Sequence, residues 1–229
     1  MKKTLVLTAV ALLSINVAEA QKITEESQIV MKNIETRTSV RQYLEEKIEI
    51  DEFIKPLLHA AMSAPSAMNR QPWEFIVIRE REMLDKMGGE FKNASYLKTA
   101  QFAIIVCGNM KEAIEGEGRD FWVQDCSAAT ENLLLAAHSM GFGAVWCGIY
   151  PSKERTEQLR NFLSLPEHII PLNIIPIGIP EKEQKPKDKW RDEKIHFDKY
   201  NASDDKNQSK TAIQKDIKQN SLQIKGKKK

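Results

Sequence analysis

Two prolines bracket residues 64–73, APSAMNRQPW, and restrict this stretch more tightly than any other part of the chain. Proline has no amide donor and its ring clashes with the preceding turn of a helix, so the stretch can form neither a helix nor a central strand. We therefore expect a rigid loop. Its small residues let a flat ligand approach the backbone, and the amides of Asn69 and Gln71 suit the edge of a heterocycle. The alternative is an ordered turn in which Trp73 fills the core, and it needs no ligand.

A helix and two strands are expected on either side of this loop. Apolar residues at helical spacing from Ile50 onward predict a helix that ends before Pro65, because the residue before proline is pushed out of the helical region. Pro56 lies in the first turns of that helix or bends it. Short apolar runs predict strands at 75–78 and 103–107. The second run is apolar throughout, which indicates burial on both faces.

The longest helix of the chain is expected at 120–140, where alanines permit close packing in the middle of the protein or at a subunit interface. Gly141 is placed to terminate it. A strand is predicted at 144–147, and a helix capped by Ser152 follows as far as residue 162.

The last predicted strand covers residues 169–178 and is interrupted by Pro171 and Pro176. Residues 179–200 are irregular and charged, which is too long a stretch for a simple connector. We expect an extended arm that crosses another subunit. The order of elements indicates an α/β or α+β fold with a mixed sheet.

The N-terminus has the pattern of a secretory signal peptide at residues 1–20. Two lysines precede the apolar run 5–17, and small residues follow at 18–20. A membrane-spanning helix is the alternative, but about thirteen apolar residues fall short of the roughly twenty that cross a bilayer. We therefore expect a protein exported to the periplasm, with no stable membrane span after cleavage.

Charge is distributed unevenly along the chain. Residues 201–229 hold eight lysines against three aspartates and are expected to form a disordered tail that is passive in solvent or touches acidic surfaces. With the formal charge of the whole chain at +2, residues 21–200 carry about −4. This balance argues against binding of nucleic acid by the globular domain, which we place at 21–200.

The cysteines and histidines give no sign of a metal site. Cys107, Cys126 and Cys147 each lie in an apolar stretch, and none is paired at a metal-ligand spacing, so they are expected to be buried thiols. The four histidines are scattered among unrelated segments, which argues against a zinc site.

Residues 37–41, RTSVR, offer two arginines and a hydroxyl at a spacing of two. In an extended segment Arg37, Ser39 and Arg41 could project to one side and bind a phosphate, because guanidinium groups bind phosphate oxygens bidentately. The alternative is a solvated helix face with the two arginines one turn apart.

In order and spacing, three segments of the chain together resemble the nitroreductase family of FMN-dependent oxidoreductases. They are Arg-x-Ser-x-Arg at 37–41, Pro-Ser-x-x-Asn-x-Gln-Pro-Trp at 65–73, and Gly-Phe-Gly-Ala-Val-Trp-Cys-Gly at 141–148. The resemblance covers roughly residues 34–200. It implies an α+β nitroreductase-like fold, with a mixed, mostly antiparallel sheet flanked by helices. It also implies an intertwined homodimer with two FMN sites at the subunit interface.

The resemblance assigns cofactor-binding roles position by position. The FMN phosphate and ribityl chain would be held by Arg37, Thr38, Ser39 and Arg41. The isoalloxazine ring would be lined from the partner subunit by Pro65, Ser66, Ala67 and Asn69. The backbone beside the flavin N5 would come from Trp146, Cys147 and Gly148. A basic pair on the same phosphate would be Lys187 and Lys189, although the family often has arginine at one of these positions.

The implied reaction is a ping-pong oxidation of NAD(P)H through bound FMN, with a small electron-poor acceptor such as a nitroaromatic or a quinone. The flavin carries the redox chemistry, so no side chain is nominated as acid, base or nucleophile. Two alternatives stay open. One is an exported flavin-binding or carrier protein without turnover, and the other is a reductive dehalogenase or flavin destructase of the same family. The short, acidic segment 110–121 has no aromatic lid and does not support a specialised pocket.

Overall fold

The computed structural model of the chain describes residues 23–46 and 48–200. The predicted signal peptide, 1–20, and the predicted lysine-rich tail, 201–229, lie outside the described residues. The chain divides into two compact units, 1–186 and 187–229, and each is described by itself.

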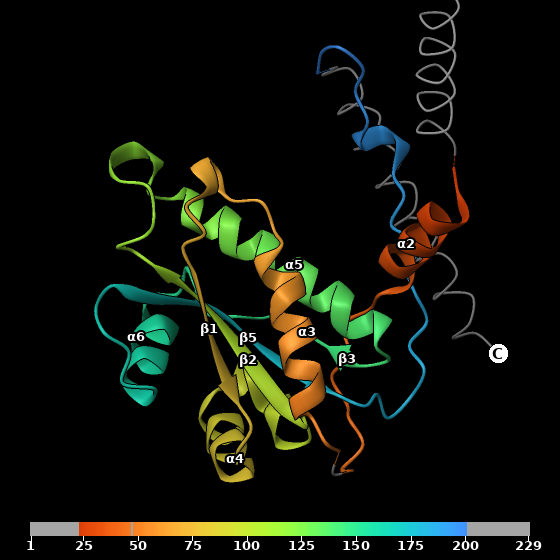
Figure 1. Cartoon of the computed structure of the whole chain (residues 1–229). Coiled ribbons are helices and arrows are strands. Elements are labelled where there is room, and N and C mark those ends of the chain that lie inside the picture. The colour runs from red at the N-terminus through yellow and green to blue at the C-terminus, as the bar shows by residue number, and fades with distance from the viewer. Residues whose placement is uncertain (1–22, 47, 201–229) are drawn as a thin grey trace, which may run out of the picture. The chain divides into compact units, whose positions relative to one another are not determined.

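A single antiparallel sheet forms the centre of the first unit (Figure 1). Its strands are β1 (Trp73–Ile78), β2 (Phe102–Asn109), β3 (Gly143–Ala144), β4 (Cys147–Gly148) and β5 (Ile169–Gly178). The order is β1-β2-β5-β3, with β4 also paired to β5, and all four strand pairs are antiparallel. A parallel bridge between Ser39 and Ala144 makes the sheet mixed. This is the mixed, mostly antiparallel α+β arrangement that the family resemblance implied.

Helices cover both faces of the sheet. On one face, α3 (Asp51–Met62) and α5 (Phe121–Ser139) pack against Phe102, Ile104 and Val106 of β2. On the other face, α4 (Arg81–Glu90) and α6 (Lys153–Phe162) pack against the alternate residues Ala103, Ile105 and Cys107. Successive side chains of a strand point to opposite faces. The two cores therefore explain why β2 is apolar and buried along almost its whole length.

Most of the predicted elements are confirmed. The helix expected from Ile50 is α3, and Pro56 lies within its second turn without ending it. The strands expected at 75–78 and 103–107 lie within β1 and β2, and the helix capped by Ser152 is α6.

The strand predicted at 144–147 is wrong in one respect, because two short strands stand in its place. Residues 177–178 of β5 pair with β3 and residues 173–174 pair with β4, so 175–176 have no partner on that side. Pro176 lies in this gap, where its carbonyl accepts a hydrogen bond of 3.1 Å from the Tyr43 hydroxyl. Proline has no amide hydrogen to donate to a neighbouring strand. The pairing on this side of β5 is therefore interrupted at Pro176, and the neighbouring chain is divided into β3 and β4. β5 runs unbroken over ten residues.

Pro171 is accommodated by a β-bulge. Val106 of β2 faces Asn173, whereas the next residue, Cys107, faces Pro171. Leu172 is therefore the extra residue of β5, and the sheet bends around the proline without losing the strand.

Helix α5 ends in a Schellman motif at Gly141. The amide of Phe142 donates to the Ala137 carbonyl at 2.9 Å, and the Gly141 amide donates to His138 at 3.0 Å. Gly141 has a φ of +83°, a left-handed conformation that glycine adopts without strain. The terminator predicted from the sequence is confirmed.

The substitution Gly141→Ala is expected to destabilise the protein by about 1 kcal/mol, because a Cβ disfavours the left-handed conformation. No heavy atom lies within 4 Å of the added Cβ, so the cost is conformational rather than steric. Gly89→Ala is the matched control. Its Cβ also meets nothing within 4 Å, but Gly89 lies within helix α4, where alanine should stabilise. Urea unfolding should give changes of opposite sign, and equal changes would contradict the assignment.

An N-terminal helix that the sequence did not predict, α2 (Glu25–Thr36), precedes the first candidate segment. It buries none of its residues, and the Asn33 amide ties it to the Leu135 carbonyl of α5 at 3.1 Å. Large apolar side chains are exposed on it at Ile29, Val30, Met31 and Ile34.

Within residues 23–46 and 48–200, no helix combines the length and the apolar character needed to cross a membrane.

Candidate functional site

Residues 37–44 form an extended segment alongside the sheet. Helix α2 ends at Thr36, Arg37 already has extended backbone angles, and the Val40 amide donates to the Ala144 carbonyl at 3.0 Å. Beyond it, Tyr43 forms an antiparallel bridge with Pro180. The alternative of a solvated helix face at 37–41 is therefore wrong. Val40 and Tyr43 are buried and anchor the segment, which leaves the polar residues between them at the surface.

The two arginines of this segment have different surroundings. The Arg37 Nε donates to Glu131 of α5 at 3.1 Å, and this side chain is only 19% exposed. Arg41 has no carboxylate partner among the described residues. Its guanidinium lies 5.9 Å from the ring centroid of Tyr96 and makes only a 3.4 Å hydrogen bond to the Ser39 carbonyl. Arg41 is thus the cation of the pair that is free to bind an anion.

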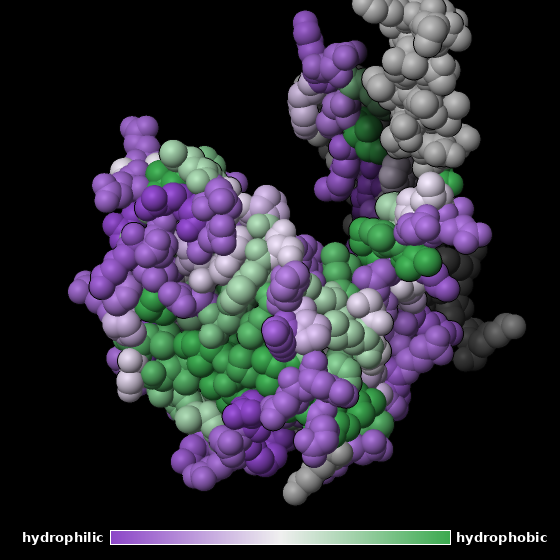
Figure 2. All heavy atoms as spheres, viewed as in Figure 1, coloured by the Kyte–Doolittle hydropathy of each residue, from purple (hydrophilic) through white to green (hydrophobic). Residues whose placement is uncertain are grey.

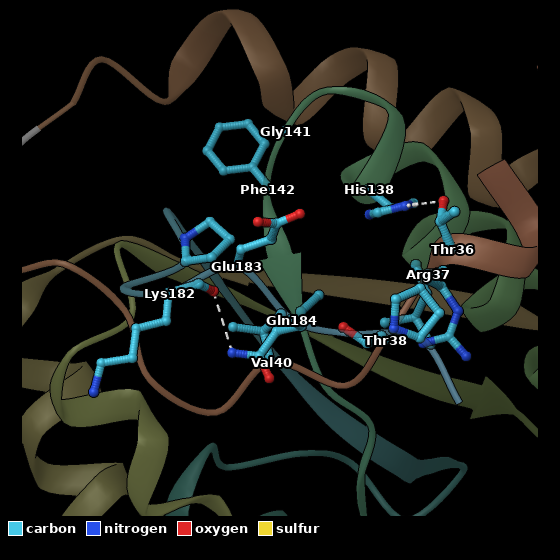
Figure 3. Close-up of a pocket in the computed structure, with 14 residues that line it drawn as sticks. Thr36, Arg37, Thr38, Val40, His138, Gly141, Phe142, Lys182, Glu183 and Gln184 are labelled. Atoms are coloured by element: carbon cyan, nitrogen blue, oxygen red, sulfur yellow. Dashed lines mark hydrogen bonds between the residues drawn. The ribbon is translucent and has the colours of Figure 1, made fainter. Parts of the chain in front are cut away.

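A cavity of about 310 Å³ opens at the C-terminal end of α5 (Figure 3). Arg37 and Thr38 line it, whereas Ser39 and Arg41 do not. Across the cavity wall the Thr36 hydroxyl lies 2.9 Å from the Nε2 of His138. Burial, together with the nearby positive charge of Arg37, lowers the pKa of His138 below its ordinary value. This wall therefore presents a neutral imidazole at neutral pH.

The segment around Gly148 is brought next to residues 37–41. Ala144 bonds to Val40, and β4 follows two residues later with Cys147 and Gly148. Burial raises the pKa of the Cys147 thiol to about 12, and the positive charge of Arg41 opposes this rise. The backbone contact between Val40 and Ala144 therefore places these two candidate segments together.

The backbone at Gly148 has open space beside it. Apart from its chain neighbours, the nearest heavy atom to a Cβ at this position would be the Trp146 Nε1, at 4.0 Å. The Gly148 carbonyl accepts hydrogen bonds from Asn93 at 2.9 Å and from Arg155 at 3.3 Å. The peptide is thus fixed on its carbonyl side and accessible at its α-carbon, which permits a ligand to approach closely.

The proline-bracketed stretch forms a loop, as expected, and includes a short 3-10 turn at Ala67–Asn69. The Ser66 hydroxyl accepts from the Gln71 amide at 2.9 Å, and the Gln71 side chain donates to Asn69 at 2.9 Å. Three residues other than glycine adopt left-handed angles: Met68, Asn69 and Gln71. Each such conformation costs on the order of 1 kcal/mol or more, and such strain gathers at functional sites.

Asp125 of α5 holds this loop in place. The residue is 6% exposed, and its carboxylate accepts a 2.8 Å hydrogen bond from the Ala67 amide. Asp125 is not among the cofactor-binding residues assigned from the sequence, which suggests only that Gln124 and Asp125 open the long helix and face the pocket or the interface. The signal that could have found it is a carboxylate inside the apolar stretch WVQDCSAA, since a buried charge needs a donor.

The loop and the Arg37 cavity lie toward opposite ends of α5 within one chain. Asp125 fixes the loop near the start of the helix, whereas His138 lines the cavity near its end. At 1.5 Å per residue these two positions are roughly 20 Å apart along the helix axis. Pro65, Ser66, Ala67 and Asn69 are therefore grouped on one part of the surface and Arg37 and Thr38 on another.

The remaining candidate residues fall into two groups. Lys187 and Lys189 belong to the second compact unit, 187–229, so their role on a phosphate stays a prediction. The three cysteines are free, buried thiols, as expected. In the part of the chain that the structure describes, no three histidine, cysteine, aspartate or glutamate side chains form a group that could hold a metal ion.

Known proteins are similar to this chain over most of the first unit. The sequence model of the nitroreductase family matches residues 34–94 and 88–179. A Methanothermobacter thermautotrophicus protein with the provisional name NADH dehydrogenase/NAD(P)H nitroreductase is 45% identical over 172 residues, which are 75% of this chain and 87% of the relative. A crystal structure from Bacteroides thetaiotaomicron with the same provisional name is 44% identical, with a TM-score of 0.70 over 75% of this chain and 98% of its own. An FMN-dependent nitroreductase from Clostridium difficile is 26% identical, with a TM-score of 0.67 over 74% of this chain and 99% of its own.

Proposed function

Because this chain belongs to the nitroreductase family, we propose that it is an FMN-dependent oxidoreductase that passes electrons from NAD(P)H to a small electron-poor acceptor. The acceptor class is nitroaromatics or quinones, and the two substrates react in turn, in a ping-pong sequence. One observation carries the proposal: Arg41, a cation without a carboxylate partner among the described residues, follows Val40, whose amide bonds to Ala144 four residues before the accessible backbone of Gly148.

The residues present fit FMN at both of its ends. A phosphate needs a free cation and hydroxyl donors, which Arg41 and the exposed Ser39 supply. A flat ring needs backbone that can be approached closely, which Gly148 supplies. Bound FMN would accept a hydride from the nicotinamide and deliver electrons to the acceptor.

The side chains and backbone of the chain position the cofactor rather than react. Arg41, Ser39, Thr38 and Arg37 hold the phosphate and ribityl chain, and the 3.1 Å ion pair with Glu131 fixes Arg37 at the edge of this group. The backbone of Trp146, Cys147 and Gly148 lies against the ring. Lys187 and Lys189 are assigned to the same phosphate by the family resemblance alone.

A homodimer completes the site. The loop residues Pro65, Ser66, Ala67 and Asn69 line the ring from the partner subunit. Their separation of roughly 20 Å from the Arg37 cavity along α5 supports this assignment. Apolar surface for a partner is present over α3 and the neighbouring edge strand β1 (Figure 2), where Ile54, Leu58, Met62 and Val77 line an open groove.

The proposal is tested by titrating the FMN-loaded full chain with NADH and with NADPH in the absence of oxygen. We expect the visible flavin absorption to be bleached by at least one nicotinamide. Addition of menadione or a nitrofuran should then restore it. Protein that gains no flavin absorption with added FMN would refute the proposal. Bound FMN that neither nicotinamide reduces would favour a carrier protein without turnover instead.

A further inference from the structure

A second cavity, of about 770 Å³, lies at the end of the sheet where β2 finishes and β5 begins. We name it the α6 pocket, after the helix that forms one wall. The Met110 amide after β2 donates to the His168 carbonyl before β5 at 2.7 Å, and this bond fixes the floor of the pocket. None of its lining residues belongs to the candidate flavin site.

Cations from three separate segments line the α6 pocket. Lys111 follows β2, Arg119 precedes α5, and Lys153 and Arg160 lie on one face of α6. Two carboxylates, Glu157 and Glu167, also line it, so the pocket carries a net charge of +2 with its histidine neutral. The side chains of Lys111, Arg119 and Lys153 form no ion pair with any described residue, and this excess positive charge is therefore available to an anion.

Polar groups without partners mark the wall formed by α6. Among the described residues, three buried side-chain atoms lack a hydrogen-bond partner, and two of them, the Thr156 hydroxyl and the Arg160 Nε, belong to this wall. Arg160 is held only by Glu157, at 3.0 Å, and that carboxylate is 60% exposed. An unpaired buried donor is costly, and an exposed ion pair contributes little. Arg160 can therefore leave Glu157 and bind a ligand that accepts hydrogen bonds from both its Nε and its terminal nitrogens.

From this arrangement we infer that the α6 pocket binds a phosphate or pyrophosphate group of a small molecule. Two arginine forks and two lysines match an anion of two or more charges, and the N-terminus of the ten-residue α6, where Lys153 is the first residue, adds a favourable dipole. The hydroxyl of Thr156 and the Nε of Arg160 supply donors to its oxygens once Arg160 turns from Glu157.

Two sources of such a group are chemically equivalent at the pocket. One is the phosphate-bearing part of NAD(P)H, because Tyr150 of the pocket lies only two residues beyond Gly148. The other is a free phosphate compound that is not the co-substrate. The first source rests on the proposed function, whereas phosphate binding itself does not.

Calorimetric titration of the FMN-loaded full chain with inorganic pyrophosphate, at constant ionic strength, tests the site directly. We expect one pyrophosphate per chain. Loss of a charge-assisted contact in Arg119→Ala or Lys153→Ala should weaken binding about tenfold. Both side chains are exposed, so unchanged thermal midpoints should show intact folding. Lys86→Ala is the control, since it removes an equal charge from an exposed ion pair on α4, outside the pocket.

The outcomes separate the sources and can overturn the site. If Arg119→Ala and Lys153→Ala raise the KM for NADPH but not for NADH, the pocket takes the nucleotide 2′-phosphate. If the KM rises for both, it takes the pyrophosphate bridge. If neither changes while pyrophosphate binding weakens, the ligand is a free phosphate compound. Absence of pyrophosphate binding, or equal weakening by Lys86→Ala, would overturn the inference, even in a protein that oxidises NAD(P)H normally.

Discussion

Replacing Arg41 by alanine is expected to weaken FMN binding by roughly 10- to 100-fold, the range that corresponds to losing hydrogen bonds between charged groups. The reason is that Arg41 is the one arginine of the 37–41 segment with no carboxylate partner among the described residues, so no internal ion pair competes for it. Arg37→Ala should have the smaller effect on FMN affinity, because the guanidinium of Arg37, which lines the cavity, is already paired with Glu131.

Fluorescence titration of the apoprotein with FMN measures this change. Arg41→Lys keeps the charge but loses the planar fork, so its affinity should lie between those of the wild type and the alanine variant. Lys86→Ala is the control, because Lys86 is an exposed cation paired with Glu82 at 2.7 Å on α4 and lines neither the candidate segments nor the groove over α3 and β1. If Arg41→Ala binds FMN as tightly as Lys86→Ala does, the phosphate is held elsewhere.

The contrast between Arg37 and Arg41 shows a feature of the site that the sequence alone could not predict. Both arginines look equivalent in the pentapeptide RTSVR. They differ because Glu131, which pairs with Arg37, is 94 positions away along the chain. No local pattern encodes a partner at that separation, so the segment could be predicted from sequence but the unequal roles of its two arginines could not.

The local backbone structure could be predicted from the sequence where a single residue type permits few conformations. The prolines of residues 64–73 required a loop, and Gly141 required a helix end, and both are present. Pro176 misled the prediction because its effect depends on the neighbouring strand. The proline leaves β5 intact and instead divides its neighbour into β3 and β4.

The helices that sequence reasoning missed have weak signals for physical reasons. α2 buries none of its residues, so its apolar side chains do not mark a core-facing stripe. α4 contains the pair Gly88 and Gly89, which lowers helix propensity, and Gly88 is required because its Cβ would lie 2.8 Å from the Lys98 side chain. Tertiary packing, rather than local preference, decides both cases.

Asp125→Ala is expected to destabilise the protein by about 2 to 3 kcal/mol, because it removes a charged acceptor and leaves the Ala67 amide without a partner. The loss should be greater than for an exposed ion pair such as that of Asp85 with Arg81, where the Asp85→Ala control should cost less than about 1 kcal/mol. Urea unfolding measures both values.

The conformation of the loop gives a more specific test of the role of Asp125 than the stability of the protein does. Met68, Asn69 and Gln71 hold left-handed angles that persist only while the surroundings enforce them. Without the Asp125 carboxylate we expect the Ala67 amide to exchange its hydrogen at least tenfold faster and the FMN affinity to fall, because these residues line the ring in the proposed dimer. Asp125→Asn retains an oxygen acceptor at the same position and should recover most of the protection. An alanine variant whose Ala67 amide exchanges as slowly as that of the wild type would show that the loop is held by its prolines and internal hydrogen bonds, and that Asp125 contributes only to the packing of α5.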